Sequence, residues 1–367
     1  MRIVITTTLN NNLFHAKLVP LVRSRPDVEL VVVSDREGPK YERVTWVYPT
    51  GWLKLIGRLP GRFLLLINEV FKKDCKLVMA YSLVPHGLFA VIVAKIRRIP
   101  VFLHFIAGPA ELRFAHDKRV TDNRLIEKTP WPGLWEKVVG MFAHASDRIF
   151  VPGSITAKQL VQEGIQPEKV SILHSTVDPK RYSPPELGAP RDIDIVVCAQ
   201  LRERKRPMFT LEIFRKLVAI NPDIKLCWLG DGIMHEEFSE KINALGLQNN
   251  LEWLETDNVS SYFVRSKLFL LCSINEGLSL ASLEAMACGV VPIVARCGDM
   301  EYAIHNKENG IVLEQSASVE NYETSISCIL NQEQLWERYS KEAIREIREN
   351  HSFEVAEARW RHILASL

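Results

Sequence analysis

Two glutamates eight residues apart, Glu276 and Glu284, are the residues whose types and spacing best suit chemistry. Glu276 lies in a predicted loop after a buried strand that ends near Ser273, and Glu284 lies in a helix predicted from Ala281 to the C-capping Gly289. The N–H groups at the start of a helix lack backbone partners and can bind an anion. They belong here to Leu280, Ala281 and Ser282. A diphosphate on these amides would have one carboxylate on each side of it for hydroxyl groups.

A basic segment, Ala199–Pro207, is the second candidate group, and it follows the first predicted strand of the second half of the chain. Its cations include Arg202, Arg204 and Lys205. Such a cluster is usually a solvated loop, but at the carboxyl end of a strand facing a cleft it is well placed to bind phosphate. We therefore expect it to meet the same diphosphate as the helix amides.

The segment from Glu276 to Ala295 closely resembles the E-x7-E signature of glycosyltransferase family 4. Members of this family are retaining glycosyltransferases of the GT-B fold, in which two Rossmann-like parallel-sheet domains face a central cleft. The resemblance covers roughly residues 191–315 and is fainter elsewhere. It implies that Glu276 contacts hydroxyls of the donor sugar and that Glu284 holds the ribose of the nucleotide.

The loop around Glu276 departs from the family pattern at two places. Cys272-Ser273 stands where the family has Pro-Ser, and Ser279 replaces the second loop glycine. The resemblance implies that this loop and the first helical turn bind the donor through Asn275, Gly277, Leu278, Ser279, Leu280 and Ala281.

The basic segment looks like the family's G-R-L-x-x-x-K-G segment, whose Arg and Lys neutralise the donor diphosphate. Lys205 matches the Lys, whereas Gln200 stands where many members have Arg, so Arg202 or Arg204 would supply the second positive charge. No metal ion or other cofactor is expected, because Lys205 and the helix amides would replace a metal. Asp192-Ile-Asp194 lies at the start of a strand and is not expected to bind one.

Two further segments match the part of the family site that holds the nucleotide base. Gly230-Asp231-Gly232 resembles the G-x-G turn beside the base. Trp253–Thr256, with Leu254 and Glu255, occupies the segment whose backbone recognises the base. Either segment could instead be a plain turn.

In the N-terminal half, His104 comes near the end of a predicted strand, Val101–Phe105. A lone histidine at such a position is more often structural. The family, however, places a histidine at the end of this strand, near the donor sugar and diphosphate, so His104 is the catalytic candidate from this half.

Two N-terminal segments are candidates for the acceptor or the diphosphate. The family's Gly-rich loop after the first strand is replaced by a polar turn, in which Asn11 and Asn12 would make this contact. The polar stretch Pro109–Trp131, with Arg113 and His116, is either an acceptor-side element or a surface excursion.

Strand-like and helix-like patterns alternate along both halves, which predicts an α/β protein with two parallel sheets covered by helices. A Pro-rich stretch, Ser183–Pro190, separates the halves. We expect an N-terminal, acceptor-side domain over residues 1–182 with a C-terminal helix at about 352–367, and a nucleotide-sugar-binding domain over residues 183–351. The chain has neither G-x-G-x-x-G nor a P-loop motif, which disfavours dehydrogenases and P-loop enzymes.

The charge is unevenly distributed. Residues 1–182 carry 27 Lys and Arg against 16 Asp and Glu, and residues 183–367 carry 19 against 28. The basic half indicates an anionic partner, which could be a membrane face, a phosphorylated acceptor or the acidic half itself. Gly51–Phe63 spaces Lys54, Arg58 and Arg62 four apart, either as a helix with a basic outer face or as a patch that docks on an anionic leaflet. No nucleic acid partner is expected.

We expect a cytoplasmic protein, with the inner face of the membrane as a peripheral site. Met1–Thr6 is typical of a first strand rather than a signal peptide, and the seven cysteines form no C-x-x-C pair. Leu77–Ala94 lacks charged side chains, but Pro85-His86-Gly87 interrupts it. This predicts a strand followed by a helix that starts at His86, not a transmembrane helix.

The motifs and the resemblance together predict a retaining glycosyltransferase that acts in polysaccharide or glycolipid assembly. It would move a sugar from a nucleotide-diphosphate sugar, a UDP-sugar in preference to a GDP-sugar, to a hydroxyl of a saccharide or lipid-linked acceptor. One alternative is a nucleotide-sugar epimerase of the same fold, which needs no acceptor. The other is a non-catalytic protein that only binds a nucleotide sugar, which the missing Arg at Gln200 keeps open.

Overall fold

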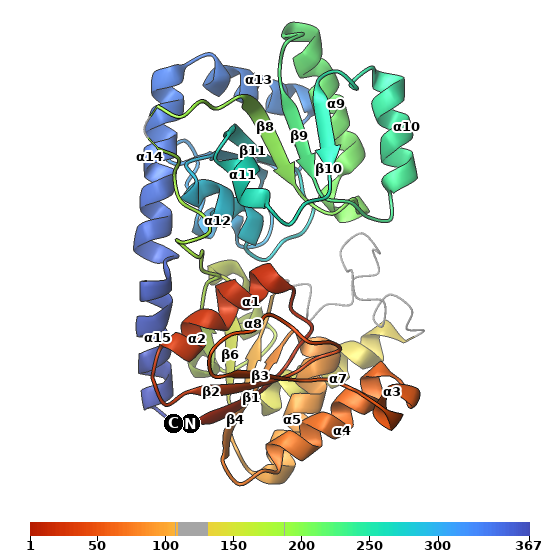
Figure 1. The fold of residues 1–367 in the computed structure, drawn as a ribbon, viewed down its shortest axis with the longest axis vertical. Helices are drawn as coiled ribbons and strands as arrows, with labels where there is room; N and C mark the ends of the chain where they lie inside the picture. The colour runs from red at the N-terminus through yellow and green to blue at the C-terminus, as the bar shows by residue number, and fades with distance from the viewer. Residues whose placement is uncertain (107, 109–130, 187) are drawn as a thin grey trace. The chain divides into compact units, whose positions relative to one another are not determined.

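The computed structural model describes residues 1–106, 108, 131–186 and 188–367. They form two units, one of Met1–Thr176 with Phe353–Leu367 (unit 1) and one of Val177–Ser352 (unit 2). Unit 2 therefore begins a few residues before the expected boundary at residue 182, and Tyr182 belongs to it. Figure 1 shows the elements of each unit.

Unit 1 is built on a seven-stranded sheet with the order β3-β2-β1-β4-β5-β6-β7. Every pairing in it is parallel. The strands are β1 (Arg2–Thr6), β2 (Glu29–Val33), β3 (Val44–Val47), β4 (Cys75–Tyr81), β5 (Val101–His104), β6 (Arg148–Val151) and β7 (Val170–Ile172). The parallel sheet predicted from the alternating patterns is confirmed.

Successive strand residues point to opposite faces of a sheet, so this sheet has an apolar core on each side. Ile3 and Ile5 of β1 pack on one side and Val4 on the other. The first side is covered by α1 (Asn11–Lys17), α2 (Val19–Arg23) and α15 (Phe353–Ala365). The second side is covered by α4 (Arg58–Val70), α5 (Leu88–Arg97), α7 (Pro132–Ala145) and α8 (Ser154–Gln162). Glu357 of α15 pairs with Arg23 of α2 at 2.8 Å, so the last helix packs within unit 1.

The interpretation of Gly51–Phe63 as one helix with a basic outer face is wrong in two respects. A short helix, α3 (Trp52–Leu55), is separated from α4, because Gly57 between them has a φ of 101°. Arg62 does not lie on an outer face, since it is 4% exposed and pairs with Asp35 at 2.9 Å.

Unit 2 contains a six-stranded parallel sheet with the order β10-β9-β8-β11-β12-β13. Its strands are β8 (Ile193–Cys198), β9 (Leu226–Leu229), β10 (Leu251–Leu254), β11 (Ser266–Leu271), β12 (Val291–Ala295) and β13 (Ile311–Leu313). Its helices are α9 (Pro207–Ile220), α10 (His235–Leu245), α11 (Val259–Phe263), α12 (Leu280–Ala287), α13 (Val319–Leu330) and α14 (Glu333–Asn350). Two Rossmann-like units of this kind define the GT-B fold, as predicted.

The stretch Leu77–Ala94 is divided among β4, a turn at Leu83–Gly87 and α5. The predicted strand and helix are confirmed, except that the helix begins at Leu88 rather than at His86. In the part of the chain that the structure describes, no helix has both the length and the apolar content to cross a bilayer.

Candidate functional site

The predicted donor residues of unit 2 follow two neighbouring strands. Gln200–Lys205 come after β8 and Asn275–Ala281 come after β11. The strand order reverses between these two strands, and ligands of open parallel sheets bind outside the carboxyl ends of the strands at such a point. Backbone hydrogen bonding joins the two segments, because the amide of Ile274 donates to the carbonyl of Arg204 at 2.8 Å.

Lys205 and Glu276, predicted to act on the same donor, are brought into direct contact. The Lys205 ammonium donates to Oε1 of Glu276, and Nη1 of Arg204 lies 3.6 Å from Oε2. Glu276 is buried, and burial alone would raise its pKa. The charges of Lys205 and Arg204 outweigh burial and lower the pKa of Glu276, so this carboxylate is ionised at neutral pH.

Arg204, not Arg202, supplies the second positive charge beside Glu276. Its guanidinium also donates to the carbonyl of Asn275 at 3.2 Å, which ties it to the loop. The side chain of Arg202 donates to Oε1 of Gln200 at 3.1 Å. The sequence left both arginines open as replacements for the family's Arg at Gln200, and the contacts favour Arg204.

The Glu276 loop keeps its shape through close contact with the loop after β12. The amide of Asp299 donates to the carbonyl of Gly277 at 2.8 Å. Gly298 has a φ of 51°, and a Cβ on it would lie 1.7 Å from the carbonyl oxygen of Glu276. Only glycine fits at this position, a constraint that the sequence analysis missed.

Helix α12 begins one residue earlier than predicted, and one of its first amides is already used. Ser279 is the N-cap, and its hydroxyl accepts a hydrogen bond from the amide of Ser282 at 3.3 Å. The prediction of three unpaired amides is therefore wrong for Ser282. The amides of Leu280 and Ala281 are the two at this helix start that suit an anion.

Glu284 is buried in unit 2 with an exposure of 4%, which distinguishes it from an ordinary surface residue of a helix. Burial raises its pKa to about 8, although a hydrogen bond with Tyr182 and the charge of Arg181 act in the opposite direction. Tyr182 is itself buried in the core of unit 2. Neither Arg181 nor Tyr182 was predicted, because both precede the Pro-rich stretch that we took as the boundary.

The two glycines predicted beside the base let the loop after β9 approach the loop after β8. A Cβ on Gly230 would lie 2.5 Å from the carbonyl oxygen of Ala199, and one on Gly232 would lie 2.5 Å from that of Leu201. Gly230 also donates its amide to the carbonyl of Leu254 at 2.9 Å. Glu255 directly follows β10 and is exposed. These residues therefore lie at the same sheet edge as Glu276, beyond β8.

In unit 1 the strand order reverses between β1 and β4, and a histidine that was not predicted lies there. His86 follows β4, and its ring nitrogens lie 3.2 Å from Oγ1 of Thr6 and 3.5 Å from Oγ1 of Thr8. Burial, reinforced by the charge of Arg62, lowers the pKa of His86 to about 3. The ring is therefore neutral at physiological pH.

The other predicted residues of unit 1 are placed differently from expectation. Asn11 and Asn12 form the first turn of α1 rather than a loop, because Asn10 caps this helix by accepting from the amide of Leu13 at 2.9 Å. His104 ends β5, but it is 3% exposed and its ring stacks on Tyr81 at 4.1 Å between centroids.

The His104 ring also lies 5.8 Å from that of Trp360 on α15, within the core of unit 1. This packing matches the structural interpretation of a lone histidine. Arg113 and His116 lie outside the described residues.

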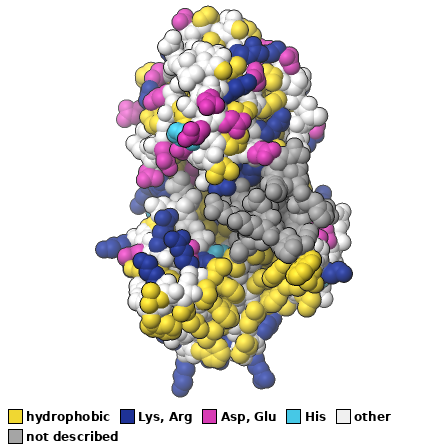
Figure 2. All heavy atoms as spheres, turned by 90° about the vertical axis from the view of Figure 1, so that its right-hand side faces the viewer, with side chains coloured by type: hydrophobic (Ala, Val, Ile, Leu, Met, Phe, Trp, Pro, Cys, Tyr) yellow, Lys and Arg dark blue, Asp and Glu magenta, His cyan; other side chains and the backbone are white. Residues whose placement is uncertain are grey.

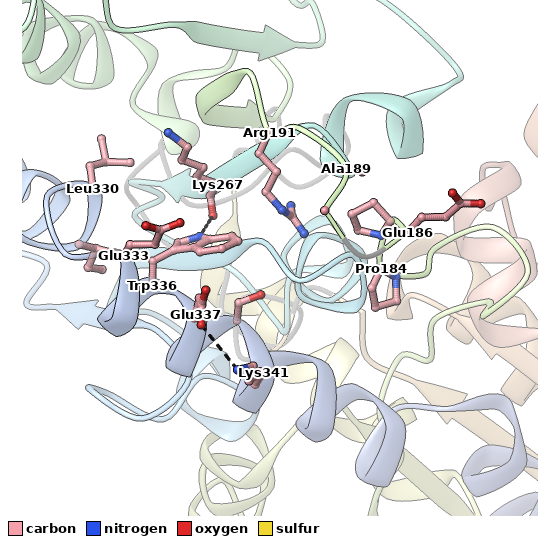
Figure 3. A pocket seen from close by; sticks show the side chains of 14 residues that line it. Pro184, Glu186, Ala189, Arg191, Lys267, Leu330, Glu333, Trp336, Glu337 and Lys341 are labelled. Carbon is pink, nitrogen blue, oxygen red and sulfur yellow. Dashed lines mark hydrogen bonds and ion pairs between the residues drawn. The ribbon is translucent and has the colours of Figure 1, made fainter.

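A pocket of about 760 Å³ lies at the opposite edge of the sheet of unit 2, where β8 and β11 begin (Figure 3). Its walls include Arg191, Lys267 and Trp336, and none of the predicted site residues lines it. The Arg191 guanidinium lies 5.3 Å from the centre of the Trp336 ring, whose Nε1 donates to the carbonyl of Lys267 at 3.0 Å. This pocket is separate from the predicted donor site.

Asp192 and Asp194 occupy the same strand-start edge. Asp192 pairs with Arg265, and Asp194 pairs with Lys267 at 2.9 Å. Among the residues that the structure describes, no group of three or more His, Cys, Asp and Glu side chains is placed to hold a metal ion.

Comparison with known families agrees with this geometry. Residues 21–181 match the family model described as Glycosyltransferase Family 4, and residues 181–346 match the model described as Glycosyl transferases group 1. The two matches together extend over most of the chain. Each half of the chain therefore matches a glycosyltransferase family, and the N-terminal half matches glycosyltransferase family 4.

Similar curated proteins include one of the subunits of the phosphatidylinositol N-acetylglucosaminyltransferase of Arabidopsis thaliana, 29% identical over 40% of this chain and 34% of that protein. The D-inositol 3-phosphate glycosyltransferase of Rhodococcus jostii is 25% identical over 56% of this chain and 49% of that protein. The chain thus spans between a third and a half of the length of these relatives.

Solved structures share the fold at low sequence identity. HepE from Anabaena, in complex with UDP and glucose, superposes with a TM-score of 0.80 at 14% identity, over the full length of both chains. Sucrose-phosphate synthase from Thermosynechococcus elongatus gives a TM-score of 0.77 at 13% identity, also over both full lengths.

Proposed function

We propose that this protein is a retaining glycosyltransferase that moves a hexosyl or N-acetylhexosaminyl group from a UDP-sugar to a hydroxyl of an acceptor, without a metal ion. The observation that carries the proposal is the cluster at the switch point of unit 2. Lys205 and Arg204 flank the buried carboxylate of Glu276, and the amides of Leu280 and Ala281 follow it directly.

The charges in this cluster suit a leaving diphosphate. As the glycosidic C–O bond breaks, negative charge grows on the diphosphate, so fixed cations and helix amides stabilise the transition state more than the ground state. Glu276 would accept hydrogen bonds from hydroxyls of the sugar, and Glu284 from the ribose. The acceptor hydroxyl would attack from the face that the diphosphate leaves, which retains the anomeric configuration.

The names of similar proteins support the choice of donor and acceptor. HepE has been solved with UDP-glucose, which favours a UDP-sugar over a GDP-sugar. A phosphatidylinositol N-acetylglucosaminyltransferase and a lipopolysaccharide galactosyltransferase are among the similar proteins, and both names include a lipid acceptor. We therefore propose a lipid-linked acceptor, as in glycolipid or surface polysaccharide assembly.

Thermal unfolding with a panel of UDP-, GDP- and ADP-sugars tests the donor first. A ligand at about 100 times its dissociation constant adds about 2.7 kcal/mol of stability, so one UDP-sugar should raise the melting temperature selectively. A higher melting temperature with a GDP-sugar alone would show that the donor is a GDP-sugar instead. No change in melting temperature with any nucleotide sugar would refute donor binding.

Turnover then separates an enzyme from a binder. Lys205→Ala and Glu276→Ala should abolish transfer, while Lys216→Ala, which removes an exposed Lys–Glu pair with Glu320 in the same unit, should leave it unchanged. Conversion of the donor without an acceptor would indicate the epimerase. Donor binding with no turnover in the wild type would indicate the non-catalytic protein.

A further inference from the structure

Unit 1 exposes large apolar side chains on four neighbouring helices. Trp52 and Leu55 of α3 are 63% and 87% exposed, Ile96 of α5 is 66% exposed and Met141 of α7 is 67% exposed. Helix α3 contacts α4, α4 contacts α5, and α5 contacts α7, so the helices form one continuous layer. We call their exposed surface the α3–α7 face. Further exposed apolar residues on or beside these helices are Ile56, Leu64, Phe71, Ile92, Leu134 and Trp135.

Figure 2 shows hydrophobic side chains gathered on the N-terminal unit, with Lys and Arg at the margins. Soluble surfaces rarely expose a large continuous apolar patch, and such a patch marks a site of interaction. None of these apolar residues belongs to the predicted donor site. The α3–α7 face therefore needs a partner that the transfer reaction does not explain.

Cations outnumber acidic residues around this face. Exposed cations on or beside the four helices are Lys54, Arg58, Lys72, Lys73, Lys95, Arg98 and Lys137. The four helices contain two acidic residues, of which Glu69 is buried against Arg2 and Glu136 is half-buried. Beside the helices, Asp147 pairs with Lys95 at 2.9 Å and Asp74 is exposed. The charge that complements this face is negative.

We propose that the α3–α7 face docks on an anionic lipid bilayer. Apolar and aromatic side chains on helices enter the boundary between head groups and acyl chains, while Lys and Arg beside them meet anionic head groups. Trp52 suits the interface because tryptophan collects at membrane–water boundaries. Arg62, which the sequence placed in such a patch, is buried beside Asp35 and takes no part.

A second copy of the chain suits this face less well. In a two-fold dimer the same patch meets itself, so Lys54 and Arg58 would face the same cations of the other copy. Like charges across an interface oppose association, whereas an anionic leaflet attracts every cation on the face.

The test is co-sedimentation of the full chain with sucrose-loaded vesicles, without any nucleotide sugar, so its outcome is independent of the transfer reaction. We expect binding to phosphatidylcholine vesicles that contain phosphatidylglycerol, little binding to phosphatidylcholine alone, and weaker binding as salt rises. Lys54→Glu with Arg58→Glu should weaken binding by at least about 30-fold, since each Lys or Arg near an anionic leaflet adds about fivefold.

Two double variants separate the apolar contribution of the α3–α7 face from nonspecific hydrophobic adsorption to the vesicles. Trp52→Ser with Leu55→Ser should weaken binding by about tenfold or more, because each side chain loses its burial in the lipid. Ile220→Ser with Ile233→Ser removes two apolar residues of unit 2 that are 63% and 74% exposed, and it should leave binding unchanged. All substituted residues are exposed, and thermal unfolding confirms that each variant folds.

Three outcomes would overturn the proposal: no binding to anionic vesicles, equal binding to neutral ones, or equal binding by wild type and the α3 variants. Sedimentation velocity without lipid addresses self-association. If the chain forms a dimer, and this dimer dissociates in the variant with Trp52→Ser and Leu55→Ser, the face joins two copies instead.

Discussion

Glu284→Gln should remove a pH-dependent part of the stability of unit 2. The pKa of the buried Glu284 is raised from its ordinary value of 4.5 to about 8. Between these two values the folded chain keeps a proton that the unfolded chain releases. The contribution is thus complete below about pH 4.5 and is lost as pH rises through about 8, so the free energy of unfolding falls across this window.

The size of the effect follows from the shift. A difference of one bound proton changes the free energy of unfolding by about 1.4 kcal/mol per pH unit. From about pH 5.5 to about pH 7.5 the wild type should therefore lose about 2.5 kcal/mol through Glu284 alone. Glutamine has nearly the same shape and no charge, so the variant should not lose this amount. Contributions from other titrating groups are common to both proteins and cancel in the comparison.

Urea unfolding at the two pH values measures this difference. The fluorescence of Trp228, buried in the core of unit 2, is suited to report the transition. Glu337→Gln, an exposed position on α14, serves as the control and should follow the wild type at both pH values. Parallel pH dependence in wild type and Glu284→Gln would mean that Glu284 is already ionised, and the reasoning from burial would fail.

Three further substitutions probe the Glu276 loop and the start of α12. Lys205→Ala leaves the buried Glu276 without its closest cation and should lower the free energy of unfolding by about 3 kcal/mol in urea titrations, against less than about 1 kcal/mol for Lys216→Ala at an exposed pair. Gly298→Ala should displace the loop, because a Cβ would lie 1.7 Å from the Glu276 carbonyl oxygen, and calorimetry should show UDP binding lost in a folded protein. Ser279→Ala removes the cap of α12 and should cost about 1 kcal/mol, with an unchanged urea midpoint arguing against the cap.

The positions of the Glu276 loop and of α12 were predicted well because their signals are local. Good helix formers and the glycine after them predict the start of α12 within one residue. This prediction also places Glu276 in the loop and Glu284 in the helix. The contact between Lys205 and Glu276 depends on the sheet instead, since β8 and β11 are not consecutive in the chain and are neighbours only where the strand order reverses. The backbone hydrogen bond between Ile274 and Arg204, which joins the two loops, is seen only in the structure.

The failures concern contacts between distant segments. A spacing of four residues put Arg62 on an outer face, but periodicity does not reveal that Asp35, directly after β2, lies within reach of it. Tyr182 was assigned to the wrong unit because a Pro-rich stretch marks a break in pattern rather than the place where packing changes. The polar turn after β1 has residues suited both to cap a helix and to contact a phosphate, and the sequence does not decide between these roles; in the structure Asn10 caps α1.

The two glutamates of the signature lie in opposite electrostatic environments, which their spacing alone does not indicate. Both are buried, so desolvation favours the neutral form of each. Glu276 is ionised because Lys205 and Arg204 lie beside it, in the loop after the neighbouring strand β8. At Glu284, Arg181 and Tyr182 only partly offset the effect of burial on the pKa. The difference therefore arises from which loops meet at the switch point. It suits the proposed roles, in which one carboxylate lies beside a cation for the diphosphate and the other meets an uncharged hydroxyl.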